Sequence, residues 1–330
     1  MSYNISKTKL KKFSLFSIGS KKFGYGHYNR IKNLISILKT KRRKFSHYSY
    51  EKNYKNKNSF LNKIKLEVNL GNNIIIDFSN NLFLNKSTIL RIKKIFSKKK
   101  TSSIYIIDTP TKKNLSTILD LDYAKTLIPF EVADDVKKEF SKIKKKKIGM
   151  EYFIYSNKNL KIKKKIYDVT LSFGGSDHYK GSIYVLKLLK NLKIKKNIVV
   201  VIGKYFNDNY KQEILLFCKK NKFKSIFFSR NFSDILNKSR LLITNSGLTK
   251  YEGFMHGLSV LVFSDSKESQ KIDKIFINKT KQVHFSYLKN LQNDTLRLKK
   301  NLKKQFNLKL FDKNIIKSNI NKIQNFFKND

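Results

Sequence analysis

The residues Asp168-Val-Thr-Leu-Ser-Phe-Gly-Gly-Ser-Asp177 join a short, mostly apolar run to a pair of glycines. The run Asp168–Phe173 predicts a buried strand, and the spacing of apolar residues in Tyr179–Leu192 predicts a helix after it. A second apolar run, Asn197–Gly203, predicts the next strand. A strand, a helix and a strand in this order are typical of a parallel sheet that is covered by helices.

The same alternation extends along the chain in both directions. On the C-terminal side we expect strands at Ser225–Phe228, Leu241–Thr244 and Ser259–Phe263, and helices at Asn209–Asn221, Phe232–Ser239, Thr249–His256 and Glu268–Asn278. On the N-terminal side we expect strands at Phe13–Ile18, Asn73–Phe78, Ser103–Ile107, Tyr123–Pro129 and Tyr152–Tyr155. Helical patterns follow the first of these strands, at Ile31–Leu38, and the second, at Leu90–Phe96.

The length of 330 residues favours two domains of ordinary size. We predict an α/β fold with two Rossmann-like, doubly wound domains that face each other across a cleft. The boundaries are an N-terminal domain of residues 1–155, a basic linker of residues 156–166, and a C-terminal domain of residues 167–288. Residues 289–330 are rich in Lys and Asn, but Ile316, Ile320, Ile323 and Phe327 share one helical face, which predicts terminal helices.

The composition excludes several classes of protein. Hydrophobic residues make up 40% of the chain, enough for a core, and no apolar run approaches the roughly 18 residues of a membrane-spanning helix. A single cysteine, Cys218, excludes a disulfide framework and a cysteine-based zinc site. We expect a soluble, cytoplasmic monomer without a cofactor.

The net charge of +49 raises the question of nucleic acid. The 72 basic residues are mostly Lys, are spread along the chain, and accompany abundant Asn, Ile, Phe and Tyr, a set encoded by A/T-rich codons. Biased base composition explains this charge without a specific nucleic-acid partner, although a basic surface also allows peripheral contact with a membrane. We expect the Lys-rich runs, such as Lys144–Lys147, to be solvated loops or helix faces.

The first motif with chemical potential lies between the first strand and the first helix. Gly24 and Gly26 permit a tight turn and a close backbone approach to a ligand, and the helix that follows directs free N–H groups toward an anion. His27 is the side chain best suited to proton transfer near neutral pH, so we predict it as the catalytic residue. Arg30, one helical turn later, either faces the same site or pairs with a local carboxylate.

Two further motifs follow strands of the C-terminal half. The amides around Gly174, Gly175 and Ser176 can hold a pyrophosphate, whereas Asp177 either belongs to the site or caps the next helix. A second anion-binding helix start is predicted at Ser246, Gly247 and Thr249. Glu252, further along that helix, can accept hydrogen bonds from the two hydroxyls of a ribose.

Other residue types do not combine into a further site. His47, His178, His256 and His284 are expected to be structural or exposed. No spacing of His, Asp and Glu indicates a metal site, and no nucleophile is paired with a base, so a covalent intermediate is not expected.

Together the three motifs resemble those of the GT-B nucleotide-sugar enzymes. Within these, the chain is most similar to the UDP-sugar hydrolases of pseudaminic acid biosynthesis, and more distantly to the peptidoglycan N-acetylglucosaminyltransferase. The resemblance covers roughly residues 13–280. The family's residues are matched by Gly24, Gly26, His27 and Arg30, by Ser172–Asp177, by Ser246, Gly247, Leu248, Thr249 and Glu252, and by Gln270 in the sugar-contacting loop.

The resemblance implies a UDP-linked sugar as substrate, with uracil bound by backbone near Ser229. The chain departs from the family pattern where Ser246 replaces a Gly, Leu248 a Ser and Ser269 an Asn. Three hypotheses therefore remain: a metal-independent UDP-sugar hydrolase, a GT-B glycosyltransferase that uses the same donor, and an inactive sugar-nucleotide binder or basic scaffold.

Overall fold

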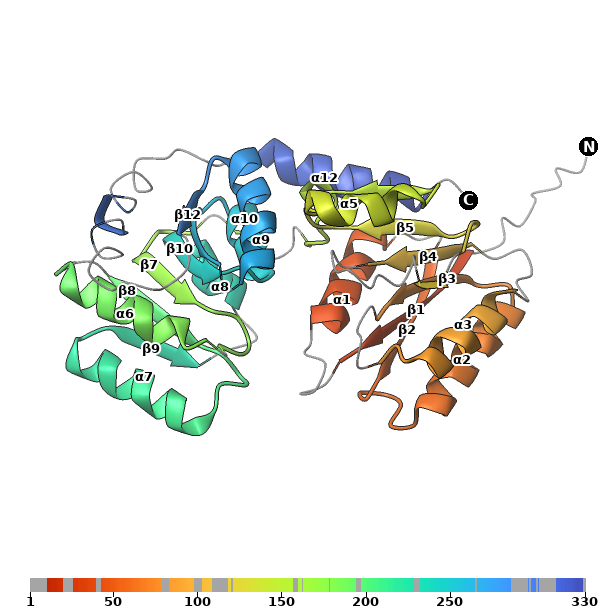
Figure 1. The fold of residues 1–330 in the computed structure, drawn as a ribbon, viewed down its shortest axis with the longest axis horizontal. Helices are drawn as coiled ribbons and strands as arrows, with labels where there is room; N and C mark the ends of the chain where they lie inside the picture. Colours follow the sequence, from red (N-terminus) through yellow and green to blue (C-terminus); the bar gives the residue numbers. More distant parts are fainter. Residues whose placement is uncertain are drawn as a thin grey trace, which may run out of the picture. The chain divides into compact units, whose positions relative to one another are not determined.

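The computed structural model describes residues 11–19, 26–39, 43–78, 83–97, 103–108, 118–119, 121–156, 160–161, 163–177, 179–193, 197–227, 232–264, 266–285, 296, 298–300, 302 and 313–328. The chain divides into two compact units: Met1–Tyr155 together with Ser318–Asp330, and Ser156–Lys317. Each unit holds one six-stranded sheet in which every pair of neighbouring strands is parallel (Figure 1). The predicted α/β fold with two doubly wound sheets is confirmed.

The first unit is built on a sheet with the strand order β2-β1-β3-β4-β5-β6. Its strands are β1 (Lys11–Ile18), β2 (Arg43–Tyr50), β3 (Asn73–Asp77), β4 (Ile104–Ile107), β5 (Lys125–Ile128) and β6 (Lys146–Ile148). Its described helices include α1 (Gly26–Leu38), α2 (Lys57–Asn69), α3 (Lys86–Ser97), α5 (Asp134–Ser141) and most of α12 (Lys313–Phe326), with a 3₁₀ turn at Met150–Tyr152.

Alternation along β1 explains why helices cover both faces of this sheet. Phe13 and Leu15 point to one face and pack with residues of α1 and α12, whereas Phe16 and Ile18 point to the other and pack with residues of α2 and α3. All four side chains are at most 1% exposed. A strand buried on both faces reads as a nearly continuous apolar run, which is why β1 was predictable.

The C-terminal helix α12 belongs to the core of the first unit. Ile323 and Phe327 are at most 1% exposed, and the Phe327 ring lies 4.6 Å from the ring of Tyr105 on β4. The Gln324 amide donates a hydrogen bond of 2.9 Å to the Ile37 carbonyl of α1. Ile323 and Phe327 of the predicted apolar face thus pack against residues distant in the sequence, whereas the side chain of Ile316 lies outside the described residues.

Three expectations for the first unit were wrong or incomplete. The Lys-rich run Lys144–Lys147 supplies two of the three residues of the edge strand β6, where the exposed Lys147 opposes pairing with another sheet edge. Tyr152–Tyr155 is not a strand, because Tyr152 ends the 3₁₀ turn and the three residues after it do not join the sheet. Strand β2 and helix α2 were not predicted, since the apolar residues of β2 are separated by Ser and His and those of α2 by Lys and Asn.

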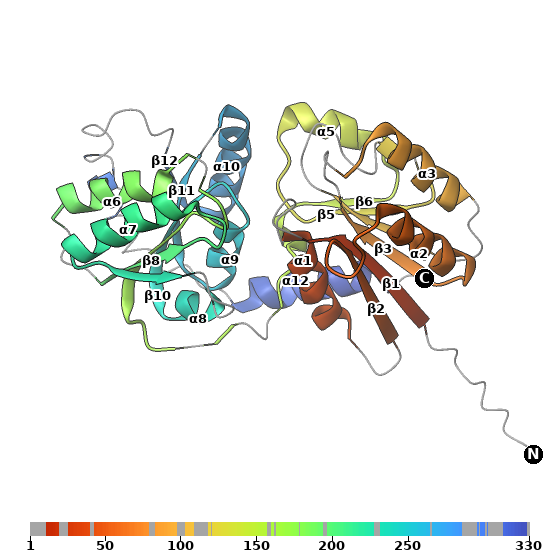
Figure 2. The ribbon, with the colours of Figure 1, turned by 90° about the horizontal axis from the view of Figure 1, so that it is seen from below.

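The second unit is built on a sheet with the strand order β12-β11-β10-β7-β8-β9. Its strands are β7 (Tyr167–Ser172), β8 (Ile198–Ile202), β9 (Lys224–Phe227), β10 (Ser239–Asn245), β11 (Ser259–Phe263) and β12 (Val283–Phe285). Its helices include α6 (Gly181–Asn191), α7 (Asp208–Lys220), α8 (Phe232–Asn237), α9 (Thr249–Met255) and α10 (Lys267–Thr280). Residues of α6 and α7 share one core with β7, β8, β10 and β11, and Figure 2 shows these two helices side by side.

Each strand order contains one point at which the chain reverses its direction of travel across the sheet. In the first unit this point lies between β1 and β3, and in the second between β7 and β10. At such a point the loops after the two strands diverge, so ligands of doubly wound folds bind there, beyond the carboxyl ends of the strands. The predicted motifs at His27, Gly174 and Ser246 follow β1, β7 and β10, three of these four strands.

The burial of α12 predicts a large energetic effect of its core residues. Ile323→Ala removes a fully buried side chain and should lower the free energy of unfolding of the first unit by about 2–5 kcal/mol. Urea denaturation followed by circular dichroism measures the loss. Lys322→Ala, at an exposed position of the same helix, is the control and should leave the midpoint nearly unchanged. Equal, small effects of both changes would show that α12 does not contribute to this core.

Candidate functional site

His27 lies in the first turn of α1, directly against the carboxyl end of β3. Its Nδ1 atom is 2.6 Å from Oδ1 of Asp77, the last residue of β3. Because β1 and β3 flank the reversal point of the sheet, the loop after β1 brings His27 to a carboxylate 50 residues later in the sequence. The His27 side chain retains 12% exposure, whereas Asp77 is completely buried.

Arg30 holds the same carboxylate with a two-pronged contact. Its Nε donates to Asp77 Oδ2 at 2.6 Å and its Nη2 to Oδ1 at 2.5 Å. Burial by itself raises the pKa of Asp77, but the charges and hydrogen bonds of Arg30 and His27 outweigh it and hold that pKa below its ordinary value. Asp77 is therefore an ionised carboxylate that only accepts hydrogen bonds.

This charge state determines which nitrogen of His27 carries the proton. Since Asp77 only accepts, His27 Nδ1 must be the donor in the 2.6 Å contact. In the neutral ring, Nε2 then has a free lone pair, which is the state of a general base. The 3.0 Å approach of Arg30 Nη2 to His27 Nδ1 follows from both groups converging on one carboxylate oxygen.

The structure shows one of the two roles that the sequence left open for Arg30. It pairs with a carboxylate, as one of the two hypotheses held, although Asp77 lies 47 residues away and not nearby in the sequence. The guanidinium is 5% exposed and lies 5.1 Å above the ring of Phe130. Contact with a substrate stays a prediction for this residue.

The Gly174–Gly175 loop follows β7 and packs its carbonyl groups inward. A Cβ atom on Gly203, after β8, would lie 2.4 Å from the Gly174 oxygen and 2.6 Å from the Gly175 oxygen, so only glycine fits there. The Tyr205 amide donates to the Gly175 oxygen at 2.9 Å. In a trans peptide the N–H points opposite to the C=O, so the amides of Gly175 and Ser176 point away from Gly203. Gly174 adopts a φ of +76°, which favours glycine.

Asp177 caps helix α6, as the alternative interpretation of this residue held. Its carboxylate accepts hydrogen bonds from the amides of Gly181 at 2.8 Å and Ser182 at 2.7 Å, and from the Tyr210 hydroxyl at 2.8 Å. The protein's own carboxylate thus occupies the N-terminus of α6. Only the loop amides before Asp177 remain for an external anion.

The segment Ser246–Thr249 joins β10 to α9. Gly247 is exposed, Ser246 and Leu248 are partly exposed, and Thr249 is 9% exposed. Glu252 lies in the first turn of α9 and is partly exposed. Within the described part of the chain, the structure shows no hydrogen-bond donor to its carboxylate, and burial raises its pKa to about 7. Glu252 is therefore an acceptor without a protein donor among the described residues.

Gln270 lies in the first turn of α10, after β11, and is partly exposed. The neighbouring Ser266 and Ser269 form a capping box at the start of α10. The Ser266 hydroxyl accepts a hydrogen bond from the Ser269 amide at 3.0 Å, and the Ser269 hydroxyl accepts one from the Ser266 amide at 2.9 Å. Because β11, β10 and β7 are adjacent parallel strands, the segments that follow them and lead to Gln270, Ser246 and Gly174 all leave the carboxyl edge of the sheet.

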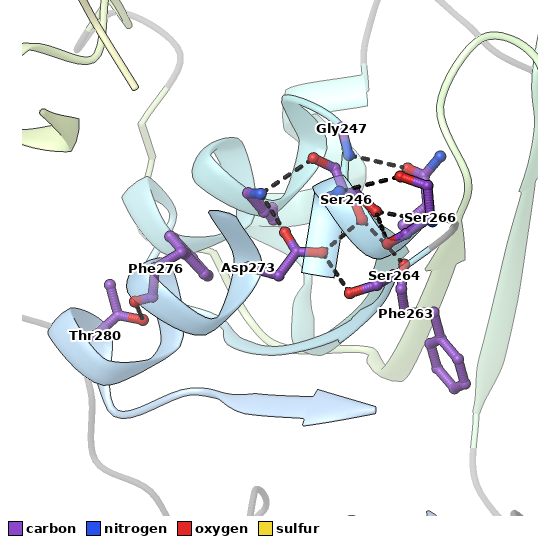
Figure 3. A network of polar contacts seen from close by, with 11 residues as sticks. Ser246, Gly247, Phe263, Ser264, Ser266, Asp273, Phe276 and Thr280 are labelled. Carbon is purple, nitrogen blue, oxygen red and sulfur yellow. Dashed lines mark hydrogen bonds and ion pairs between the residues drawn. The ribbon is translucent and has the colours of Figure 1, made fainter. Parts of the chain in front are cut away.

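A buried ion pair lies behind these loops and was missed at the sequence level. Lys250 on α9 donates to Asp273 on α10, and the same carboxylate accepts from the hydroxyls of Ser246 at 2.5 Å and Ser264 at 2.7 Å (Figure 3). Lys250 is 1% exposed and Asp273 is not exposed at all. In a chain with so many lysines, no local pattern distinguishes Lys250 from the others.

Asp77 was also absent from the predicted site. The only available signal was an aspartate at the end of a buried apolar strand, a feature that Asp108 at the end of β4 shares. Gly24 and Ser229 of the predicted site lie outside the described residues.

Two of the remaining histidines are at least partly buried and contact a neighbouring side chain. His256 is 6% exposed, its Nδ1 lies 2.8 Å from Asn237 Oδ1, and burial lowers its pKa to about 3. His47 contacts the Ser17 hydroxyl at 2.8 Å, and burial, followed by the charges of Lys52 and Lys32, lowers its pKa to about 4. His178 and the side chain of His284 lie outside the described residues.

Over the residues that the structure describes, three or more His, Cys, Asp or Glu side chains nowhere gather as a metal ion would require. The same residues include no helix with the length and apolar content needed to span a membrane.

Comparison with solved structures identifies the architecture. A protein of Listeria monocytogenes assigned as a UDP-N-acetylglucosamine 2-epimerase aligns over 97% of this chain and 98% of its own, with a TM-score of 0.60 and 11% identity. The UDP-GlcNAc 2-epimerase of Neisseria meningitidis, bound to UDP-GlcNAc, aligns over 95% and 97% with a TM-score of 0.55 and 12% identity. MurG of Acinetobacter baumannii aligns over 96% and 99% with a TM-score of 0.54 and 10% identity. The fold is of the GT-B type.

Sequence comparisons are less informative. No family model matches the chain. The uncharacterized protein MJ1062 of Methanocaldococcus jannaschii is 26% identical over 152 residues, which are 43% of this chain. The match covers only 31% of that protein's length.

The buried contact between Arg30 and Asp77 predicts a strong dependence on both charges. Asp77→Asn leaves the Arg30 guanidinium buried without a counter-ion and should lower the free energy of unfolding by about 3–5 kcal/mol, measured by urea denaturation. The double variant Arg30→Met/Asp77→Asn removes the unpaired charge as well and should recover most of this loss. If the single variant were as stable as the wild type, the carboxylate would not be paired in the native protein.

Proposed function

We propose that the protein binds a UDP-linked sugar and hydrolyses it, releasing UDP and the free sugar. The observation that carries this proposal is the His27–Asp77 contact of 2.6 Å, which orients a histidine whose neutral ring has an unprotonated Nε2 at the reversal point of the first sheet. The fold supports the choice of substrate, since one solved neighbour is bound to UDP-GlcNAc. A UDP-linked diacetamido-trideoxy sugar of the pseudaminic acid pathway is the specific substrate that the sequence motifs favour.

The second unit would bind the nucleotide. Its outward-pointing amides at Gly175 and Ser176, together with those of Ser246–Thr249, would hold the pyrophosphate across the reversal point between β7 and β10. Glu252 would accept hydrogen bonds from the two ribose hydroxyls, because its carboxylate has no donor among the described residues. Gln270, at the edge of the same sheet, would contact the sugar.

The chemistry would be carried by the first unit. His27 Nε2 takes a proton from water, and the water oxygen forms a bond to the anomeric carbon of the sugar. The bond between this carbon and the phosphate oxygen breaks, and its electron pair leaves with UDP. Asp77 keeps Nδ1 protonated and stabilises the imidazolium that forms.

Transfer to a glycan acceptor is the second candidate, because an acceptor hydroxyl would use the same base and the same donor site. A solved neighbour described as the glycotransferase of kitacinnamycin, which aligns over 96% of this chain with a TM-score of 0.52, favours retaining this alternative. A panel of UDP-sugars, incubated with and without acceptors, separates the reactions. Free sugar and UDP without acceptor support hydrolysis, acceptor-dependent release of UDP supports transfer, and a changed sugar without release of UDP supports epimerisation. Absence of both turnover and UDP binding would leave the scaffold hypothesis.

The state of Glu252 predicts how UDP binding depends on pH. Glu252→Ala should weaken UDP binding by about 1–3 kcal/mol, because the ribose loses a charged acceptor. Since burial raises the pKa of Glu252 to about 7, the carboxylate is protonated below this pH, and the affinity should rise as the pH increases from 6 to 8. Isothermal titration calorimetry measures both effects.

Glu252→Gln is the control for the pH dependence, because it keeps the shape and cannot titrate. The terminal phosphate of UDP also titrates near pH 6 by analogy with other phosphate monoesters, but it does so equally with both proteins. The ratio of the two affinities therefore isolates Glu252. An unchanged affinity of folded Glu252→Ala would remove this residue from the nucleotide site.

The role of His27 predicts a loss of turnover without a loss of nucleotide affinity. His27→Gln removes the base and should reduce kcat by about 10²–10⁴-fold, while the Kd for UDP stays near the wild-type value. Lys32→Gln, an exposed change on the same helix, is the matched control. Wild-type turnover by folded His27→Gln would overturn the mechanism, and loss of UDP binding would assign His27 to nucleotide recognition.

A further inference from the structure

The Lys250–Asp273 ion pair is too deeply buried for direct contact with a substrate. Lys250 is 1% exposed and Asp273 is fully buried, so neither side chain reaches a bound ligand. The Lys250 ammonium also lies 5.0 Å from the Tyr251 ring centroid and 5.6 Å from that of Phe276, which enclose it further. Any effect of this ion pair on ligand binding is therefore transmitted by the residues that the pair contacts.

The pair holds Ser246 at both its side chain and its backbone. The Ser246 hydroxyl donates to Asp273 Oδ2 at 2.5 Å, and the Ser246 carbonyl accepts from Lys250 Nζ at 3.1 Å (Figure 3). Ser246 directly precedes Gly247 and begins the exposed segment between β10 and α9. The conformation of this segment is therefore tied to a carboxylate on another helix.

The same carboxylate holds the neighbouring loop. The Ser264 hydroxyl donates to Asp273 Oδ2 at 2.7 Å, and Ser264 directly follows β11, which pairs with β10 through Asn245 and Phe263. Asp273 lies three residues after Gln270 on α10, a spacing that places both on one face of the helix. Asp273 thus joins the loop after β10, the loop after β11 and the beginning of α10.

Stability alone is a weak reason for such a pair. Burying two charges costs nearly as much as their attraction returns, and well-packed apolar residues of similar volume often replace a buried ion pair without loss of stability. What apolar residues cannot replace is the set of directed hydrogen bonds to Ser246 and Ser264. The distinguishing property of this pair is therefore the arrangement that it imposes on the two loops.

We propose that Lys250 and Asp273 are positioning residues, which hold the segment Ser246–Thr249 in its anion-binding conformation and in register with Gln270. This inference rests on the proposed function, in which that segment binds the pyrophosphate of UDP. It adds that the affinity for UDP depends on two residues that never contact the nucleotide.

The test is the double variant Lys250→Met/Asp273→Leu, which replaces the pair by apolar side chains of similar length. The melting temperature should stay close to that of the wild type, whereas the Kd for UDP should increase about tenfold or more, the effect of losing one charge-assisted hydrogen bond. Amide hydrogen exchange of the ligand-free protein should accelerate in residues 246–250 and 264–270. Lys250→Met/Asp273→Asn restores an acceptor for the two serines and should recover part of the affinity.

A matched control removes an exposed ion pair from the same unit. Lys211 and Asp208 on α7 lie 2.8 Å apart, and Asp208 is 93% exposed, so Asp208→Leu/Lys211→Met should change neither UDP binding nor the exchange of the two loops. If Lys250→Met/Asp273→Leu unfolds, Ser246→Ala provides the test, because it cuts the link between the loop and Asp273 and leaves the ion pair intact. Accelerated exchange and weaker UDP binding by Ser246→Ala then support the proposal.

The outcomes separate this inference from the proposed function. Wild-type affinity and wild-type exchange in a folded double variant, or in Ser246→Ala where the double variant unfolds, would overturn the positioning role. Failure of the wild-type protein to bind UDP would contradict the proposed function, and the exchange experiment, which needs no ligand, would still decide whether the pair orders the two loops.

Discussion

Every neighbouring pair of strands in the two six-stranded sheets is parallel, and the placement of each candidate functional residue follows from this constraint. Parallel strands require a crossover after each strand, so the loops at the carboxyl edge all begin where a strand has just ended. His27 and Asp77 meet at this edge in the first unit, and Gly174, Ser246 and Gln270 follow adjacent strands of the second. Residues far apart in the sequence become neighbours without any local signal.

Several of the few carboxylates in this basic chain are buried and hold other groups in place. Only 23 residues are acidic against 72 basic ones, yet Glu67, Asp77, Asp108, Glu131, Asp177 and Asp273 are all buried. Asp77 holds Arg30 and His27, Asp177 caps α6, and Asp273 joins two loops to α10. Because a buried carboxylate must be paired, each of these residues organises the cations, amides and hydroxyls around it. Among the basic residues, Arg30 and Lys250 are themselves buried against these carboxylates.

The two candidate sites differ in the partners and the pKa of their carboxylates. In the first unit, Arg30 keeps Asp77 ionised, and this state fixes the tautomer of His27. In the second unit, Glu252 has no such partner among the described residues, and burial raises its pKa to about 7. One carboxylate thus has partners within the protein, whereas the other has no hydrogen-bond donor among the described residues. The proposed division of roles, with proton transfer at His27 and nucleotide binding at Glu252, rests on this contrast.

The sequence by itself determined the class of the fold and the location of the loops. Buried parallel strands are short apolar runs, and glycines that survive in a chain with only 12 of them mark turns where backbone approaches closely, as Gly174 and Gly203 do. It did not determine β2, whose apolar residues are separated by Ser and His, or α2, whose apolar residues are separated by Lys and Asn, or β6, where the exposed Lys147 protects a sheet edge. Tertiary structure alone decided that Asp77 and not a nearby acid pairs with His27 and Arg30, that Lys250 among so many lysines is buried, and that α12 completes the first core. The reason is physical: strand periodicity is a local property, whereas the partner of a buried charge is set by strand order, which no local pattern encodes.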